Sequence, residues 1–231
     1  MFSAPLLAQE LSETIIVMAP GGAIDADDAI HLDRDALSRA GAPSLIGALA
    51  RDVAGIALSD AQGNPYQPNI IYRGFSASPL QGNAQGLAVY VDGARFNQPF
   101  GDTVNLDLLP GVAIDAVNIK DASPVYGLNA LGGVIAIATK TGKSAPGLTF
   151  FGAGGSNGRG EGGGEYGWSK GGTSAYAAFE LRRDGGWRAH SPSTLYNGYA
   201  DLGWDGADGG VHVKYLGAST DLTGNGTAPV E

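Results

Sequence analysis

Hydrophobic and polar residues alternate with a period of two in the C-terminal part of the chain. In segment 173–182 every second residue is apolar or small and the residues between are mostly polar, and the alternation recurs in 196–205 and 211–215. Because successive side chains of a β-strand point to opposite faces, this pattern predicts antiparallel strands with one apolar and one polar face. Aromatic residues stand near the ends of the apolar face, which is typical of transmembrane β-barrel strands, although a β-sandwich is the alternative.

The connections between these segments differ in length. Tight links are expected at 156–159, 170–172 and 205–210, whereas RRDGGWRAHSPS at 182–193 is long. If the first strand rises from the periplasm, the links at 170–172 and 205–210 lie on the periplasmic side and the long loop lies outside, as in outer-membrane barrels. Residues 146–231 are therefore predicted to form about five barrel strands.

Helical and strand signals alternate before residue 145. The pattern predicts short helices over 33–40 and 44–52, with Ser44 as the N-cap of the second. Leu45, Leu49 and Val53 are spaced to lie on one face of that helix.

Five strands are also predicted in this part, at 55–59, 69–74, 87–91, 114–120 and 134–139. In 134–139 the residues that point to either face of the strand are apolar. This strand should therefore be covered on both faces, as the inner strand of a small mixed sheet. Asp92 and Gly93 follow 87–91 as a tight-turn pair. The predicted fold class is an α+β domain, with a small mixed sheet and short helices, followed by antiparallel transmembrane strands of an incomplete β-barrel.

Composition narrows the functional classes. The 231 residues include 38 glycines and no cysteine, so neither a disulfide nor a thiolate metal site is available. A formal net charge of -9 repels a phosphate backbone, which argues against nucleic acid as a partner. No apolar run approaches the roughly 20 residues of a membrane-spanning helix.

Motifs for catalysis or cofactor binding are weak. A GxGxxG pattern at 162–167 has neither the strand nor the helix that a dinucleotide site needs. The histidines lack metal-ligand spacing, and the acidic cluster at 25–28 lacks the glycine and distal glutamate of a calcium loop. We therefore expect no enzyme activity, no cofactor and no metal site.

Several segments together resemble a known family. In chain order these are ETIIV (13–17), PSLIGAL (43–49), NIIYRGF (69–75), VYVDGAR (89–95) and SPVYGLNALGGVIAIATK (123–140). Residues 13–140 resemble the plug domain of a TonB-dependent outer-membrane receptor, and 147–231 resemble the beginning of its barrel. Ala54 stands where the family often has proline, Tyr72 where isoleucine is common, and 120–122 where an arginine-glycine pair is common.

The resemblance implies a domain organisation and a partner. Residues 1–12 would be the remnant of a signal or leader, 13–22 the TonB box and a flexible linker, 23–145 the plug and 146–231 the first barrel strands. The resemblance implies that one short segment adds a strand to the periplasmic C-terminal domain of TonB. Its residues are Glu13, Thr14, Ile15, Ile16, Val17 and Met18. An ordinary disordered leader is the alternative.

The resemblance also implies roles for plug residues. Two long polar loops, 77–86 and 95–107, would face the solute, with the candidate contacts Arg95, Asn97, Gln98, Phe100 and Asp102. Alternatively, these residues only seal the plug to the barrel. Arg73 is expected to be a buried or lumen-facing charge paired with a carboxylate, with an exposed arginine as the alternative. The residues implied to maintain the plug structure are Arg73, Gly74, Asp92, Gly93, Tyr126, Gly127, Gly132 and Gly133.

The implied function is active uptake of a scarce solute across the bacterial outer membrane, most commonly a siderophore-type iron chelate. The implied partners are TonB, outer-membrane lipid and that small solute, with the plug in the barrel lumen and the N-terminus in the periplasm. About five strands are visible where such a barrel has about 22. Two alternatives stay open, a non-transporting periplasmic binding module or gene remnant, and a secreted β-rich adhesin or structural protein.

Overall fold

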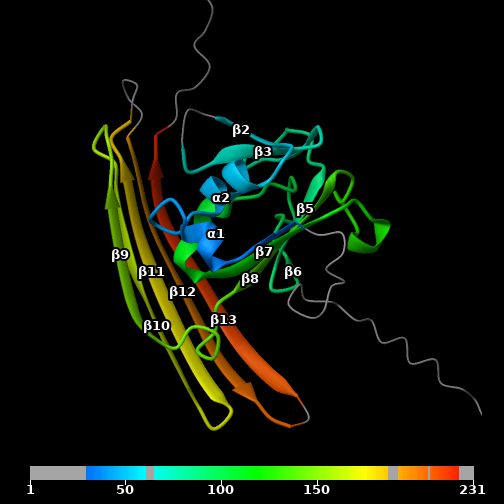
Figure 1. Cartoon of the computed structure of the whole chain (residues 1–231). Helices are drawn as coiled ribbons and strands as arrows, with labels where there is room; N and C mark the ends of the chain where they lie inside the picture. Colours follow the sequence, from blue (N-terminus) through cyan, green and yellow to red (C-terminus); the bar gives the residue numbers. More distant parts are fainter. Residues whose placement is uncertain (1–29, 61–64, 187–191, 208, 224–231) are drawn as a thin grey trace, which may run out of the picture.

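The structure is a computed structural model that describes residues 30–60, 65–186, 192–207 and 209–223. Five long strands form one curved sheet, and the short helices and smaller sheets lie against its concave side (Figure 1). We call the long-stranded sheet the wall and the part packed on it the plug. Within the described ranges, none of the helices has the length and apolar character needed to cross a membrane.

The plug consists of short elements. In chain order they are β1 (Ile30–Leu32), α1 (Arg34–Ser38), α2 (Leu45–Asp52), β2 (Ile56–Asp60), β3 (Pro68–Tyr72), β4 (Phe75–Ala77), β5 (Leu87–Val91), β6 (Ala94–Arg95), η2 (Leu106–Leu108), η3 (Gly111–Ala113), β7 (Ile114–Lys120), η4 (Pro124–Tyr126) and β8 (Gly133–Thr139). The predicted helices and strands are present. Strands β1, β4 and β6 were not predicted, because two or three residues are too few to show a periodicity.

The main plug sheet has the strand order β1-β7-β8-β5-β6. Strand β8 lies at its centre, antiparallel to β7 and parallel to β5. Six of its seven residues are buried, so the prediction of an inner strand in a small mixed sheet is confirmed. A second sheet, β2-β3-β4, contains the predicted strand 69–74, which ends at Tyr72 because Arg73 and Gly74 form a turn with φ values of 52° and 84°.

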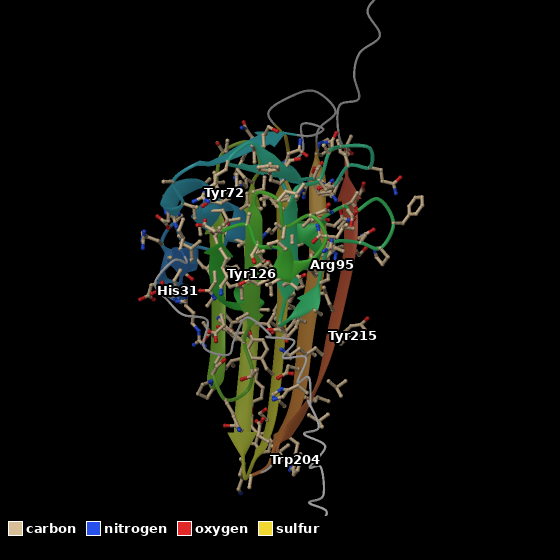
Figure 2. The ribbon with its side chains drawn as sticks, turned by 90° about the vertical axis from the view of Figure 1, so that its right-hand side faces the viewer. His31, Tyr72, Arg95, Tyr126, Trp204 and Tyr215 are labelled. Atoms are coloured by element: carbon tan, nitrogen blue, oxygen red, sulfur yellow. The ribbon has the colours of Figure 1, made fainter. Side chains whose placement is uncertain are left out.

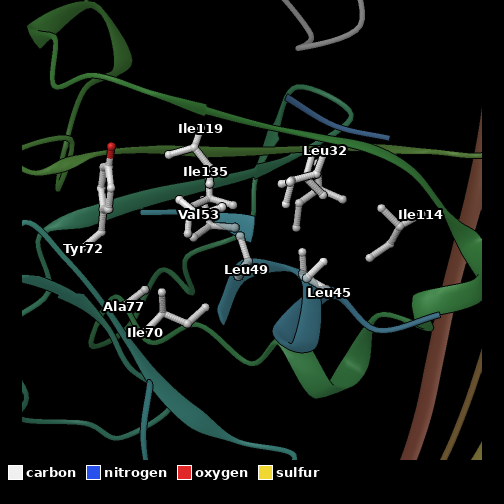
Figure 3. Close-up of a cluster of buried hydrophobic side chains, with 14 of the residues drawn as sticks. Leu32, Leu45, Leu49, Val53, Ile70, Tyr72, Ala77, Ile114, Ile119 and Ile135 are labelled. Carbon is white, nitrogen blue, oxygen red and sulfur yellow. The ribbon is translucent and has the colours of Figure 1, made fainter. Parts of the chain in front are cut away.

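The two helices begin where their capping residues predict. The carboxylate of Asp33 accepts a 2.8 Å hydrogen bond from Ala36 N, and the Ser44 hydroxyl accepts one of 3.0 Å from Gly47 N, so each satisfies a free amide of the first turn. The predicted apolar face of α2 is buried in the plug core together with side chains from both sheets (Figure 3). Full burial of one such aliphatic side chain contributes about 1.5–3 kcal/mol.

The wall contains five strands in sequential antiparallel order. They are β9 (Gly147–Gly154), β10 (Gly160–Lys170), β11 (Thr173–Asp184), β12 (Ser193–Asp205) and β13 (Gly210–Leu222). The predicted number of strands is confirmed. In the part of the chain that the structure describes, the barrel is not closed, because β9 and β13 form the two edges of this sheet.

The two faces of the wall have opposite environments. The apolar side chains at alternate positions of the wall strands are exposed, such as Phe179 at 56% and Leu202 at 62%. In β11 and β12 the side chains that alternate with them are buried on the plug side, such as Glu180 at 2% and Asp201 at 0%, whereas no residue of the edge strands β9 and β13 is buried. A water-soluble sandwich would bury the apolar parity instead, so this arrangement is that of a barrel wall around a plug.

Candidate functional site

The candidate contacts for a solute lie on one end of the plug. Loops 77–86 and 95–107, which we call the loop pair, are joined by a 2.9 Å hydrogen bond from Val104 N to Ser78 O. The Cγ of Gln81 in the first loop lies 3.2 Å from the Cβ position at Gly101 in the second. The two predicted loops therefore form one surface. The predicted TonB-binding segment, residues 13–18, lies outside the described residues.

Loop 77–86 is organised around Ser78, which is fully buried. Its hydroxyl donates to Asn69 Oδ1 and accepts from Asn83 Nδ2 at 2.9 Å. The Gln85 side chain binds the Ser78 backbone, accepting from its N–H at 2.9 Å and donating to its C=O at 3.2 Å. These bonds fix the loop, so the side chains that remain exposed project from a defined backbone.

In loop 95–107, Arg95 and Asp102 form an ion pair with 3.1 Å between Nη2 and Oδ1. The other terminal nitrogen of Arg95 donates to Leu128 O at 2.6 Å, which ties the loop to segment 123–132. Figure 2, viewed from the plug side, shows Arg95 and Tyr126 in front of the wall strands. Asp102 has a φ of 51°, a left-handed conformation that aspartate and asparagine adopt more easily than most residues.

Asn97 was predicted to contact the solute, but its side chain is only 3% exposed. Its Oδ1 accepts from Val89 N at 2.7 Å and its Nδ2 donates to Leu87 O at 3.1 Å. The amide therefore holds the loop against β5, and its predicted role changes from solute contact to support of the loop. Gln98 is exposed, and Phe100 is 79% exposed at the tip of the loop.

The expected burial of Arg73 is not found in the described residues. Its guanidinium pairs with the carboxylate of Asp121 at 2.6 Å, and the two side chains are 54% and 61% exposed. The guanidinium also lies 4.9 Å from the centroid of the Tyr72 ring. The expected carboxylate partner is present and belongs to the plug, at one of the positions where the sequence departs from the family pattern, and the exposed side chain is the alternative named above.

The predicted structural glycines occupy turns and close contacts. Asp92 and Gly93, with φ values of 49° and 83°, form the two-residue turn between β5 and β6. A Cβ on Gly132 would lie 2.4 Å from Cβ of Phe75, and one on Gly133 would lie 2.7 Å from Lys120 O. The close approach expected at this glycine pair is therefore present.

The other two residues of the predicted structural set lie in the turn that precedes β8. Gly127 has a φ of 72°, which favours glycine. The backbone carbonyl of Tyr126 accepts a 2.6 Å hydrogen bond from the Tyr90 hydroxyl, so this turn is tied to β5.

Sequence reasoning did not identify the contacts between plug and wall. At the end of β8, Lys140 Nζ lies 2.8 and 2.9 Å from the two carboxylate oxygens of Glu165 in β10. The same carboxylate accepts a 2.5 Å hydrogen bond from the Tyr176 hydroxyl. Both members of the ion pair are nearly buried, with side-chain exposures of 9% and 12%, so the pair is a specific anchor between the two parts.

A second contact joins the wall to η3 and to the start of α2. Glu180 accepts a 2.9 Å hydrogen bond from Gly111 N and pairs with Arg182 at 2.6 Å. Arg182 also donates to Pro43 O at 2.7 Å. Two charged side chains of one wall strand thereby bind two plug segments through backbone groups.

A third contact uses the predicted turn residue Asp92. Its carboxylate accepts from Thr139 N at 2.8 Å and pairs with Lys214 of β13 at 2.8 Å. The hydroxyl of Tyr199 in β12 forms a 2.7 Å hydrogen bond with the Thr139 hydroxyl. The turn therefore also fixes the end of β8 to the wall. The alternating pattern did mark Glu180, Lys214 and their neighbours as a polar face, but it did not indicate their partners.

A cavity of about 220 Å³ lies beside the second contact. It is lined by α2, by Asp107 of η2 and by Asn197 of β12, and one side-chain oxygen of each of these two buried residues has no hydrogen-bond partner. Burial raises the pKa of the Asp107 carboxyl above its usual range, although a 3.0 Å hydrogen bond from Gln67 opposes this shift. In the described ranges, no group of three or more His, Cys, Asp or Glu side chains is placed to hold a metal ion.

Comparison with known proteins gives one match to a family model. Residues 25–134 match the TonB-dependent Receptor Plug Domain. This range covers the plug elements from β1 to the start of β8, including the loop pair. No curated protein matches the chain.

Solved structures share the fold of plug and wall together. The siderophore receptor PiuA from Acinetobacter baumannii matches with a TM-score of 0.63 and 19% identity over 84% of this chain and 26% of that chain. The copper transporter OprC matches with a TM-score of 0.63 and 14% identity over 87% and 32%. The ferric citrate transporter FecA matches with 0.60 and 16% over 84% and 31%. The chain thus spans about a third or less of these proteins, and at such identities the likeness shows a shared fold.

Proposed function

Residues 25–134 are the plug domain of a TonB-dependent receptor, and from this premise we propose that the chain is the N-terminal part of an outer-membrane receptor for active uptake of a scarce solute. In this proposal residues 1–12 are the remnant of a leader, 13–22 the TonB box and linker, 23–145 the plug, and 146–231 the first barrel strands. A siderophore-type iron chelate is the cargo that we propose first.

One observation carries this proposal. The plug packs on the polar face of the wall, while the opposite face exposes apolar and aromatic side chains, among them Trp204 at 56% and Tyr215 at 70% (Figure 2). Such a face suits hydrocarbon with aromatic girdles at the interfaces. A secreted adhesin would expose this apolar surface to water, and a periplasmic module would not need the wall.

The coupling step requires energy from outside the outer membrane, and a mechanical link supplies it. We assign this link to residues 13–18, which would pair as an added strand with the periplasmic C-terminal domain of TonB. Main-chain hydrogen bonds then provide the grip. The plug would gate the barrel, and the contacts of Glu180, Lys140 and Asp92 that hold it against the wall support this role.

Binding of the full 231-residue chain, in detergent micelles, to the periplasmic domain of TonB tests the proposal. Ile15→Pro and Ile16→Pro each remove one backbone donor, and one of the two must face the partner strand. We expect that variant to bind at least tenfold more weakly, while Ile15→Val and Ile16→Val bind as the wild type does. If both proline variants bind TonB as tightly as the wild type does, the assignment of the TonB box is refuted.

A further inference from the structure

The loop pair carries very little charge. Between residues 74 and 107 the sequence contains four charged side chains, Asp92, Arg95, Asp102 and Asp107. Asp92 binds Lys214 of the wall and Arg95 binds Asp102, while Asp107 is only 6% exposed and does not reach the surface of the loops. Arg95 is 28% exposed and is further held by Leu128 O, so both terminal nitrogens of its guanidinium already have a protein partner. The surface formed by the two loops is therefore electrically neutral.

The remaining arginines of the described plug are also paired. Arg34 binds Asp115, Arg39 and Arg51 share Asp52, and Arg73 binds Asp121. The formal charge of the whole chain is -9. An anionic solute would thus meet paired arginines in a negative field, which lowers both its association rate and its affinity.

The side chains that the loop pair does expose are of one chemical kind. Gln81 and Gln98 present carboxamide groups, each able to donate and to accept hydrogen bonds, whereas the amide nitrogen of exposed Asn83 is bound to Ser78. Phe100 stands among them as a nearly free aromatic ring. Carboxamides recognise neutral oxygens, and a ring face packs on an apolar edge of a ligand.

We infer that the loop pair selects an uncharged solute that presents hydrogen-bonding oxygens and one apolar face. This inference rests on the proposed uptake function and narrows its cargo. A neutral metal chelate with hydroxamate-type oxygens and a neutral oligosaccharide both have this chemistry. A chelate with three catecholate groups, which carries three negative charges, does not.

Binding of three probes to the full chain in detergent micelles, measured by titration calorimetry, tests the inference. The probes are a neutral ferric trihydroxamate chelate, a neutral hexasaccharide and a ferric tricatecholate chelate. We expect one of the two neutral probes to bind at least tenfold more tightly than the tricatecholate, and the probe that binds identifies the source. Phe100→Ala should weaken that binding at least tenfold.

A charge-matched pair of variants tests whether the pairing of Arg95 with Asp102 is what weakens binding of the anionic probe. Asp102→Asn keeps a residue that accepts the left-handed backbone but releases the Arg95 guanidinium, so the tricatecholate should bind at least tenfold more tightly than to the wild type. Asp35→Asn removes one exposed carboxylate far from the loops in sequence and should leave this affinity unchanged.

Three outcomes would overturn the inference. They are tricatecholate binding to the wild type as tight as that of either neutral probe, no response to Asp102→Asn, and no binding of either neutral probe. If TonB binding is intact in the same preparation, any of these results rejects the neutral cargo and leaves the proposed uptake function standing. Loss of TonB binding alone would reject the function while the selectivity of the loops remained measurable.

Discussion

Removal of the Arg182 charge should release the plug from the wall. In Arg182→Met the side chain keeps a similar length and apolar bulk, but Glu180 loses its ion-pair partner and Pro43 O loses a hydrogen bond. The Glu180 side chain is 1% exposed, so its carboxylate cannot turn to water while the plug stays docked. Of its two contacts, the one from Gly111 N then remains.

The magnitude follows from this burial. Leaving one member of a buried ion pair without its partner costs about 3–5 kcal/mol. If Glu180 is changed to Gln at the same time, the carboxamide oxygen can still accept from Gly111 N and no charge remains at position 180, while Glu161, which is 16% exposed and 3.7 Å from Arg182, loses that partner in both variants. The double variant Glu180→Gln/Arg182→Met should therefore recover most of the loss and lie within about 1–2 kcal/mol of the wild type.

Hydrogen exchange read by mass spectrometry on peptides covering 106–114 measures the opening of this contact directly. The full chain in detergent micelles is compared with the single and double variants, and the protection of the Gly111 amide gives the free energy of opening. If the free energy of opening in Arg182→Met lies within about 1 kcal/mol of the wild-type value, the reasoning is refuted, since Glu180 would then be solvated without Arg182. A double variant as unstable as the single one would refute it as well.

Three further changes test the plug itself. Gly132→Ala places a methyl group 2.4 Å from Cβ of Phe75 and should cost about 1–3 kcal/mol in urea unfolding, whereas in a Phe75→Gly background, which lacks that Cβ, the same change should cost much less. Leu49→Ala deletes a fully buried side chain of α2 and should cost about 2–5 kcal/mol, seen as a lower thermal midpoint, while the same change at exposed Leu128 should have little effect. Burial raises the pKa of the Asp107 carboxyl in the folded state, so the folded chain holds the carboxyl proton more tightly than the unfolded chain does. The free energy of unfolding therefore falls as pH rises from the unfolded pKa of Asp107 through its folded pKa. Asp107→Asn should make unfolding less dependent on pH in that window, and an unchanged dependence would contradict the assigned burial.

Local features of the fold could be predicted from the sequence because neighbouring residues determine them. The Ser44 cap, the apolar face of α2 and the Asp92-Gly93 turn each depend on a few adjacent positions. Strand β8 was also predictable, since a run that is apolar on both parities can only be stable between two layers.

Contacts between distant residues could not be predicted in the same way. The hydrogen bond from Arg182 to Pro43 O spans 139 positions, and its acceptor is a backbone group with no sequence signal. Asn97 was assigned to the solute because an amide in a polar loop suits both roles, and only its burial beside β5 distinguishes them. The exposure of Arg73 likewise depends on where Asp121 lies.

The alternating strands define two faces, but alternation alone does not determine which face is inside. The plug decides this, because its surface toward the wall supplies Lys140, Gly111 N and Pro43 O as binding groups, beside an apolar patch in which Val112 and Ala113 pack with wall residues such as Tyr176 and Tyr199. Burial of Glu180 and Asp201 is tolerable only against such partners. The apolar face is then left without cover in the described structure, where large side chains such as Phe179, Leu202 and Tyr215 are more than half exposed. This arrangement favours hydrocarbon outside and a hydrogen-bonded plug inside over any secreted β-sandwich.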